Sequence, residues 1–502
     1  MGDEKIDEKI EEKLEDIIDV EDTSKSLLDK VVDYGEMTAD EDQKQFAVDI
    51  ITNFADEVSS EKIKIKKDIY RSINERITQI DQILTQQVNE ILHNKEFQKL
   101  ESSWRHVYDF VRSSEPDNMV KIRLLDVKKI DLLGDFDSAA DFDQSGLFNL
   151  VYEKEYGTYG GAPYGLLIGD YSMSRSVRDI ELLRGISQVA SSAHAPFISS
   201  ADPALFNLSS FTDLNKPKSL DSTFSSAEYG AWRSFRKTEE AKYVALTLPR
   251  IIQRLPYGGE NGLPVDTFNF TEEIVQDPDG SNYLWGNPAY KLAERMVESF
   301  RNAGWFSSIR GAENGGTVEN LPVHSFKDDN GDSTFKLPVE TIITDRREKE
   351  LDDLGFISLV YKKGTDSATF FGSKVAHLPD EYEDPVSNAN AKLNCELPYL
   401  MAVSRFAHYL KVMMRDKVGS FMSKSGTQEF LNNWINRYVM NTDNPDNYAA
   451  AKYPLKEARV DVTEKPGSPG VYNAVLYLRP HIYFNEISIS MRLVSELPSG
   501  GA

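Results

Sequence analysis

One predicted helix, at 397–423, carries the residue types that most resemble catalytic chemistry. Ser404, His408 and Lys411 recur at intervals of three and four residues, so they share one face of this helix. A hydroxyl, an imidazole and an amine on one face could act as a nucleophile with its base. No acidic side chain lies one turn before His408 to orient its ring, which favours structural hydrogen bonds or an interface. The predicted polar cluster consists of Arg405, His408, Lys411, Arg415 and Asp416.

Other motifs that could bind a ligand are incomplete. The glycine-rich segment 156–165 lacks the Lys-Ser/Thr pair of a phosphate loop and precedes a strand, which favours a flexible loop. Segment 328–332 resembles a calcium loop, but its glycine is fourth rather than sixth and Val339 occupies the last ligand position. A hairpin turn is the better interpretation there. The single cysteine, Cys395, is better explained as a small buried residue than as a nucleophile.

No set of residues predicts a metal site or a known catalytic motif. No Walker A, HExxH or GxSxG spacing occurs, and no two histidines stand at metal-ligand spacing. The seven histidines are His93, His106, His194, His324, His377, His408 and His481. The sequence therefore predicts no catalytic residue, no cofactor and no metal, but residues far apart in the chain can still build a site in three dimensions, so an enzyme is not excluded by these motifs. The alternatives that remain are a soluble α/β enzyme using the face of His408 and an adaptor with an exposed sheet edge.

Composition limits the class of protein further. The 502 residues are enough for two to four domains, and the net charge of −24 argues against a nucleic-acid binder. Residues 1–50 hold 18 acidic and 6 basic side chains, so half of that charge (−12) lies in a tenth of the chain. No apolar run is long enough to span a membrane, no signal peptide is evident, and one cysteine fits a reducing compartment. We therefore expect a cytoplasmic protein without membrane insertion.

Helical patterns dominate the first 115 residues. Ile6, Ile10, Leu14 and Ile17 form one narrow apolar stripe, typical of a solvated tail helix or of a docking peptide. A second helix is predicted at 42–58. A long helix at 61–92 carries a near-heptad stripe that predicts either packing within the protein or, as the alternative, a coiled-coil seam. Another helix is predicted at 95–112.

From residue 120 the pattern changes to alternating strands and helices, which is typical of α/β or α+β folds. Strands are predicted at 120–127, 165–171, 196–200, 243–248, 306–310, 339–344 and 355–361. Helices are predicted at 175–195, 224–236 and 286–303. A further short helix is predicted to begin shortly after residue 344, with Asp345 as its N-cap. We expect the chain to have five parts: an acidic arm at 1–60, long helices at 61–115, an α/β domain at 116–377, a linker at 378–392 and a C-terminal domain at 393–502. The C-terminal domain is predicted to contain helices at 397–423 and 427–439.

The end of the chain carries the clearest period-2 patterns. Residues 473–478 and 486–494 alternate apolar and polar side chains, as half-buried strands do. A hairpin of two strands is marginal alone, and its free edge is a template for another strand. Either an earlier segment or a partner must cover that edge. The predicted residues of an intermolecular sheet are Val475, Tyr477, Ile487, Ile489, Met491 and Leu493.

Several long and ordered segments are specific enough to compare with known families. They include Glu-Ser-Ser-Trp-Arg at 101–105 and Leu-Trp-Gly-Asn at 284–287. The other segments are 96–100, 164–171, 193–198, 231–236, 344–351, 404–416, 432–435 and 478–481. In these segments, from about residue 90 to about 498, the chain resembles the large subunit of the type VI secretion contractile sheath, the TssC/VipB/IglB family. The resemblance implies a protein that is not an enzyme.

The resemblance implies a structural role in a multi-domain sheath subunit. Such subunits pair with a small sheath subunit (TssB/VipA) and with neighbouring large subunits, and polymerise around an Hcp inner tube on a baseplate. Contraction drives the tube outward for effector delivery, and an AAA+ unfoldase of the ClpV type disassembles the sheath. The resemblance also implies a sheet shared between chains, built from the C-terminal strands, a small-subunit strand and a neighbour's N-terminal arm. By the same resemblance, Ile6, Ile10, Leu14 and Ile17 would belong to an unfoldase recognition peptide.

Overall fold

A computed structural model describes residues 43–59, 69–259, 261–274, 280–306, 308–327, 333–417, 423–442, 446–464, 472–481 and 491–496. The chain divides into two compact units, residues 1–87 and 88–502. The predicted stripe of Ile6, Ile10, Leu14 and Ile17 lies outside the described residues, as do Ile487 and Ile489. Each unit is described by itself.

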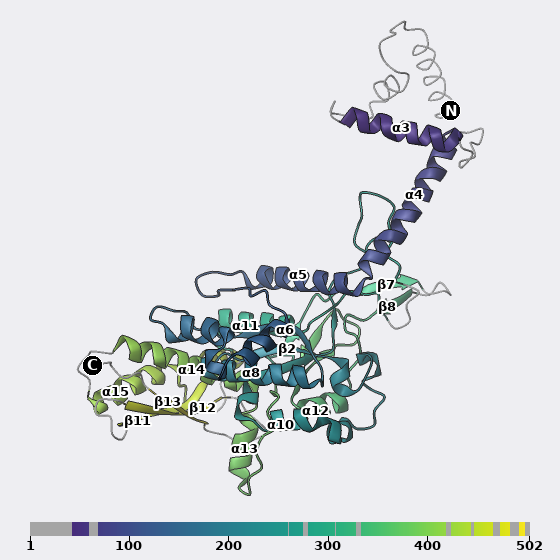
Figure 1. The fold of residues 1–502 in the computed structure, drawn as a ribbon. Coiled ribbons are helices and arrows are strands. Elements are labelled where there is room, and N and C mark those ends of the chain that lie inside the picture. The colour runs from purple at the N-terminus through teal and green to yellow at the C-terminus, as the bar shows by residue number, and fades with distance from the viewer. Residues whose placement is uncertain are drawn as a thin grey trace. The chain divides into compact units, whose positions relative to one another are not determined.

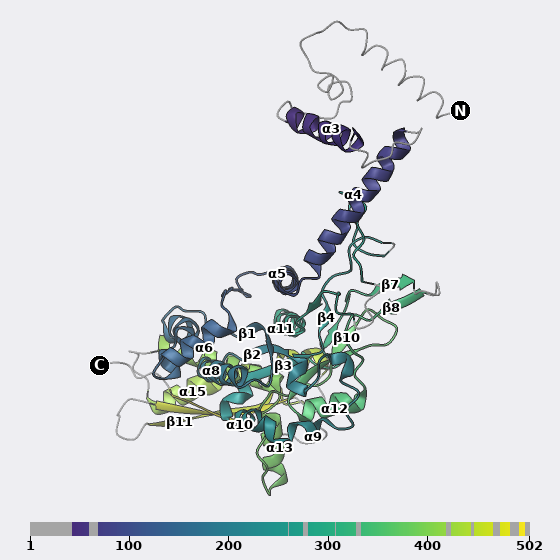
Figure 2. The same ribbon diagram turned by 45° about the vertical axis from the view of Figure 1, so that its right-hand side comes forward.

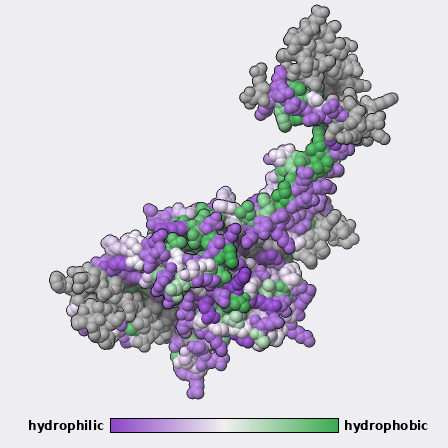
Figure 3. Space-filling model, in the orientation of Figure 1, coloured by the Kyte–Doolittle hydropathy of each residue, from purple (hydrophilic) through white to green (hydrophobic). Residues whose placement is uncertain are grey.

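The first unit contains α3 (Lys44–Ser59) and most of α4 (Ile69–Leu92). The apolar stripe of α4 is exposed at Ile73, Ile77, Ile80 and Leu84, and its hydrophobic side chains are visible in Figure 3. The preference for packing within the protein is therefore wrong for these four residues. Spacing predicts which side chains share a face, but a partner is needed to bury that face.

The second unit is built from many short elements. Its α-helices are α5 (Lys95–Ser114), α6 (Lys129–Ser138), α7 (Gly146–Phe148), α8 (Val177–Ala193), α9 (Leu220–Phe224), α10 (Gly230–Arg236), α11 (Ala289–Ala303), α12 (Asp345–Asp353), α13 (Pro385–Leu393), α14 (Leu397–Asp416), α15 (Lys424–Ile435) and α16 (Asn447–Lys452). The π-helical segment η3 (Asn149–Gly157) and the 3-10 turns η2 (Phe142–Gln144), η4 (Pro203–Phe206), η5 (Phe211–Asp213), η6 (Ala227–Tyr229), η7 (Glu239–Tyr243) and η8 (Asn436–Tyr438) complete the set.

The described strands form four sheets. The strands are β1 (Leu167–Met173), β2 (Phe197–Ala201), β3 (Val244–Leu248), β4 (Ile251–Ile252), β5 (Trp285–Gly286), β6 (Thr317–Val318), β7 (His324–Lys327), β8 (Ser333–Lys336), β9 (Phe356–Tyr361), β10 (Ala368–Phe370), β11 (Leu455–Glu464), β12 (Tyr472–Pro480) and β13 (Met491–Glu496). The central sheet has the order β1-β2-β3-β9-β10-β6, with its first four strands parallel. The C-terminal sheet has the order β11-β12-β13 and is antiparallel. The pairs β4-β5 and β7-β8 form small hairpin-like sheets.

The central sheet is covered on both faces, which confirms a mixed α/β fold. Figures 1 and 2 show α11 on one side of β1, β2 and β3, and α8 and α10 on the other. Along β3, Val244, Leu246 and Leu248 enter one hydrophobic cluster while Ala245 enters the other. A parallel sheet buried on both faces needs such continuous apolar strands, and β3 is buried along its full length.

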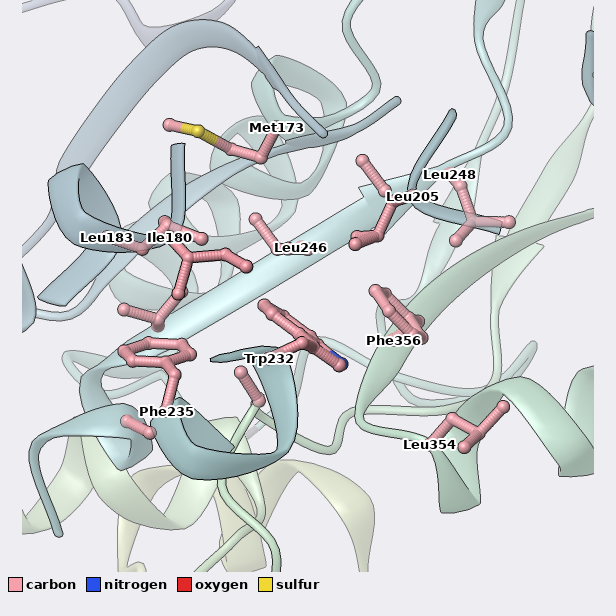
Figure 4. Close-up of a cluster of buried hydrophobic side chains, with 14 of the residues drawn as sticks. Met173, Ile180, Leu183, Leu205, Trp232, Phe235, Leu246, Leu248, Leu354 and Phe356 are labelled. Carbon is pink, nitrogen blue, oxygen red and sulfur yellow. The ribbon is translucent and has the colours of Figure 1, made fainter. Parts of the chain in front are cut away.

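Aromatic side chains fill the cluster between the sheet and α10. Trp232 stacks on Phe356, with ring centroids 5.9 Å apart and an interplanar angle of 12° (Figure 4). Phe235 and Leu246 belong to the same cluster and are fully buried. Large aromatic rings contribute much of the apolar area that such a core removes from water.

Local signals explain where the core helices begin and end. The Ser176 hydroxyl accepts a hydrogen bond from the Asp179 N–H and starts α8. His194 ends the same helix in a left-handed conformation with φ of 51°. Thr344, not Asp345, is the N-cap of α12, since its hydroxyl accepts from Arg347. Glycine at 304 has φ of 77° and ends α11, where a side chain would be strained.

Several predictions of secondary structure are wrong. Residues 120–127 form no strand, because they pair with no neighbouring strand, although Ile122 and Val127 pack against the core clusters. Segments 306–310 and 339–344 are irregular in their described parts. The predicted helix 224–236 is broken into α9, η6 and α10.

The segment 378–392, predicted as a linker, contains most of helix α13. The Asp384 cap and Pro385 at the first helical position begin this helix. Whether the segment connects two domains stays a prediction.

We expect Trp232→Ala to lower the free energy of unfolding by about 3–5 kcal/mol, because it leaves a cavity against Phe356. Trp104→Ala is the matched control, since that indole is 65% exposed in the structure, and its effect should stay within about 0.5 kcal/mol. Urea unfolding of the full chain measures both. Equal losses in the two variants would contradict the assigned core.

Candidate assembly interface

The predicted polar cluster lies at the junction of α14 with the central domain. The His408 Nε2–H donates to the Ala193 carbonyl oxygen at 2.8 Å, linking α14 to the end of α8. The His194 ring is 6.3 Å away, centroid to centroid, and its Nδ1 is 3.0 Å from the Tyr243 hydroxyl. Burial lowers the pKa of His408 to about 3 and that of His194 to about 4, so both rings are neutral in the folded protein.

The cationic residues of the cluster bind η3. Lys411 Nζ lies 3.4 Å from the ring centroid of Tyr156 and 3.3 Å from the Tyr152 hydroxyl oxygen. Burial, with the nearby charge of Arg415, lowers the pKa of Lys411 to about 8. Arg415 donates to the Tyr156 and Thr158 carbonyl oxygens at 2.7 and 2.6 Å. These contacts attach α14 to the start of the glycine-rich segment 156–165.

The remaining members of the cluster are separated from these contacts. Arg405 lies over the Tyr409 ring at 4.6 Å, and Asp416 is exposed. Ser404 and His408 are each only 2% exposed, so solvent hardly reaches the pair that suggested a nucleophile and base. The structure thus places this helix face inside the second unit, where α14 meets α8 and η3.

A second buried joint fixes α5, and no pattern in the sequence predicts it. Arg254 donates to Glu101 at 2.7 Å and to Glu272 at 2.6 Å, and all three side chains are almost fully buried. Burial acts to raise the pKa of Glu101, but hydrogen bonds and charge from Arg254 and Arg105 outweigh it and lower the pKa. Breaking one member would leave an unpaired buried charge, which is costly.

His106 extends this joint on the same face of α5. Its Nε2 accepts a hydrogen bond of 2.6 Å from the Asn287 N–H, and its ring stacks on Tyr290 at 4.7 Å. A Cβ at Gly286 would lie only 2.2 Å from Nε2, so this glycine permits the close approach. Burial, with the nearby charge of Lys291, lowers the pKa of His106 to about 3. The motifs at 101–105 and 284–287 therefore meet in space.

Helix α5 shows a row of large apolar side chains to solvent, while His106 and Phe110 on the same helix are buried against the body. The exposed side chains repeat at intervals of three or four residues and are Phe97, Leu100, Trp104, Tyr108 and Val111. Trp104 and Tyr108 are 65% and 63% exposed. Such a contiguous row of large apolar residues, with Trp and Tyr at its centre, is typical of an interaction surface. We call it the α5 stripe.

The C-terminal strands form the second candidate surface (Figure 1). The sequence predicted a hairpin with an open edge, but β11 pairs with one side of β12 and β13 with the other. Val475 lies opposite Val494, and Tyr477 opposite Arg492. The predicted residues Met491 and Leu493 belong to β13. Among the described strands, none pairs with the outer side of β13.

The structure offers little for small-molecule chemistry in the residues it describes. Within them, no three His, Cys, Asp or Glu side chains gather closely enough to hold a metal ion. One cleft of about 240 Å³ is lined by polar residues, among them Glu239, Lys242, His377 and Asn390. Burial raises the pKa of the Cys395 thiol to about 12, which suppresses the reactive thiolate. No helix in the described ranges is both long and apolar enough to cross a bilayer.

Comparisons with known proteins decide the family. Residues 74–377 match the family model VipB, "EvpB/VC_A0108, tail sheath N-terminal domain". Residues 386–497 match VipB_2, "EvpB/VC_A0108, tail sheath gpW/gp25-like domain". The type VI secretion system sheath protein TssC1 of Pseudomonas aeruginosa is 44% identical over 439 residues, 87% of this chain and 88% of the relative. The chain belongs to the TssC/VipB family of type VI secretion sheath proteins.

Family membership confirms the resemblance seen in the sequence. The chain is a structural sheath subunit, and the alternative of a soluble enzyme has no support. The anti-feeding prophage baseplate, solved by cryo-electron microscopy, aligns with 64% of this chain and 63% of its own at 10% identity. Its TM-score of 0.32 is too low to carry an argument. The α5 stripe and the edge of the C-terminal sheet are therefore interpreted as surfaces of a sheath subunit.

We expect the sheath subunit to lose stability in acid through its buried neutral histidines. His408 takes up a proton near pH 6.5 when unfolded but only near pH 3 when folded. The contribution of each such histidine to the free energy of unfolding is therefore complete above pH 6.5. Below that pH the free energy of unfolding falls by about 1.4 kcal/mol per pH unit for each of them. Urea unfolding at pH 7.5 and 5.5 should show a smaller loss for His408→Gln than for the natural chain. An unchanged pH dependence in that variant would contradict the assignment.

Proposed function

We propose that this chain is the large subunit of a contractile sheath that co-assembles with a small sheath subunit around an Hcp inner tube in the bacterial cytoplasm. Contraction would drive the tube and its effectors outward from a baseplate. The single observation that carries the proposal is the outer edge of β13, with which no described strand pairs, in a member of the sheath family. A sheet edge presents unpaired N–H and C=O groups, and these bind an added strand directionally.

The geometry of the sheet indicates which groups β13 offers. Both backbone groups of Val460 on β11 face away from β12, because they bond the side chain of Asn432. Along antiparallel strands, pairs of residues whose backbone groups face each other alternate with pairs whose backbone groups face away. Val460 and Leu476 are a pair of the second kind, so the N–H and C=O groups of Leu476 point toward β13. Leu476 is paired with Leu493, whose backbone groups therefore point back toward β12. The backbone groups of the residues on either side of Leu493 point away from β12, toward the outer edge. The backbone groups of Arg492, Val494 and Glu496 are left for an incoming strand.

We propose that two kinds of strand meet this sheet: one from the small sheath subunit and one from the N-terminal arm of a neighbouring large subunit. Every backbone hydrogen bond contributes roughly 0.5–1.5 kcal/mol, and a strand adds several in a fixed direction. Such a connection resists sliding while flexible segments let subunits rotate. In this arrangement residues 1–60 are the arm, 61–115 the long helices, 116–377 the α/β domain, 378–392 a connection and 393–502 the domain that carries the sheet.

The α5 stripe is proposed as the contact with the small sheath subunit. Its spacing fits a second helix packed alongside, and Trp104 and Tyr108 would supply the central contacts. The buried joint of Glu101, Arg254 and Glu272 holds this surface rigid from the other side. Rigid support lowers the ordering cost of binding.

The energy for contraction is proposed to reside in a metastable extended packing of subunits, released when the interfaces repack. No nucleotide is needed in the sheath for that step. An AAA+ unfoldase of the ClpV type would then recover subunits, with Ile6, Ile10, Leu14 and Ile17 as its recognition residues. That assignment rests on the family resemblance and the apolar stripe alone.

We expect Val494→Pro to abolish tubules when the chain is expressed with its small sheath subunit, because proline removes an outward N–H from β13. Val494→Thr keeps that N–H and is the matched control. Deletion of 486–502 should have the same effect as the proline. Negative-stain electron microscopy measures the outcome, and normal tubules from Val494→Pro would disprove the β13 site.

Trp104→Ala combined with Tyr108→Ala should reduce recovery of the small subunit by several-fold in co-purification, without lowering the unfolding free energy. Tyr448→Ala is a fair control, because its ring is 63% exposed, as is that of Tyr108. Unchanged recovery in the double variant would refute the α5 contact while leaving the β13 site untouched.

A further inference from the structure

The edge of the C-terminal sheet opposite β13 is occupied from within the chain. Helix α15 lies beside β11 (Figure 1), and its Asn432 side chain bonds both backbone groups of Val460. Asn432 Nδ2 donates to the Val460 carbonyl oxygen at 2.8 Å, and Asn432 Oδ1 accepts from the Val460 N–H at 2.9 Å. One amide thus takes the place of a neighbouring strand at this residue.

The orientation of this amide is fixed by its surroundings. Besides Val460, Asn432 Nδ2 donates to the Gln428 carbonyl oxygen at 2.8 Å, so both of its hydrogens are used. Reversing the amide would place its oxygen against two carbonyl oxygens. Leu431 and Ile435, on the same helix, are fully buried and hold α15 in place.

The rest of the β11 edge is partly occupied as well. The Val462 N–H, two residues on, points toward Gln428 Oε1 at the longer distance of 3.4 Å. At the other end, Met440 N–H donates to the Leu455 carbonyl oxygen at 2.9 Å. Three points along β11 are therefore bonded by residues of the same chain, with Asn432 at the centre.

We propose that Asn432 makes strand addition one-sided, so that the sheet accepts a partner strand at β13 and not at β11. This inference rests on the proposed function, in which β13 is the site of strand addition. A sheet with two free edges can join neighbours at both ends and grow without limit, as aggregates do. A helix that covers one edge restricts growth to the geometry that the other edge dictates.

The test compares Asn432→Leu with Asn433→Leu in the full chain, expressed with and without the small sheath subunit. Asn433 is the adjacent, exposed residue, so its variant controls for adding a leucine to α15. We expect Asn432→Leu to give a several-fold rise in thioflavin T-binding, fast-sedimenting material and Asn433→Leu to match the natural chain. Equal behaviour of the two variants would overturn the proposal.

A second substitution distinguishes two causes of aggregation in the Asn432→Leu variant: strand addition at the exposed edge of β11, and unfolding of the domain. The Ala458 N–H faces the same way as that of Val460, two residues along an unbroken stretch of β11. Adding Ala458→Pro to Asn432→Leu should remove the aggregates, because proline blocks strand addition at that edge. Aggregates that persist would show that Asn432→Leu only unfolds the domain, and the proposal would fail. Tubules from Val494→Pro, in contrast, would refute the β13 site and leave the result on Asn432 unaffected.

Discussion

The buried pairing of Arg254 with Glu101 and Glu272 is the interaction on which the rest of the assembly surface depends. Three charges with little exposure are stable only while they stay paired, so the position of α5 on the body is tightly constrained. These ion pairs act together with the buried Phe110, which packs into a hydrophobic cluster of the body. The row of Phe97, Leu100, Trp104, Tyr108 and Val111 stays exposed.

The same principle operates at α14. His408, Lys411 and Arg415 bond to backbone or aromatic groups of α8 and η3, while Leu397, Leu400 and Met401 of the same helix enter the hydrophobic clusters. Hydrogen bonds require narrow ranges of distance and angle, so the polar contacts add a directional constraint to the apolar packing of α14.

Sequence reasoning reached the elements whose signals are local. The helix predicted at 175–195 is α8, and the strand at 243–248 is β3, because cap residues and apolar runs lie within a few positions of each other. It failed where distant segments decide. Residues 120–127 alternate like a strand but have no partner, and the inward face of α5 depends on Arg254 and Glu272, about 150 and 170 residues away.

The edges of the C-terminal sheet show why interaction surfaces are harder still to predict. The alternation of Ala458, Val460 and Val462 marks β11 as a strand, but only the fold shows that Asn432 closes its outer side. Asn432 bonds the outer side of β11, whereas no described strand pairs with the outer side of β13, so the two edges of this sheet differ. That difference depends on contacts between residues about 30 positions apart, which the period of a single strand cannot reveal.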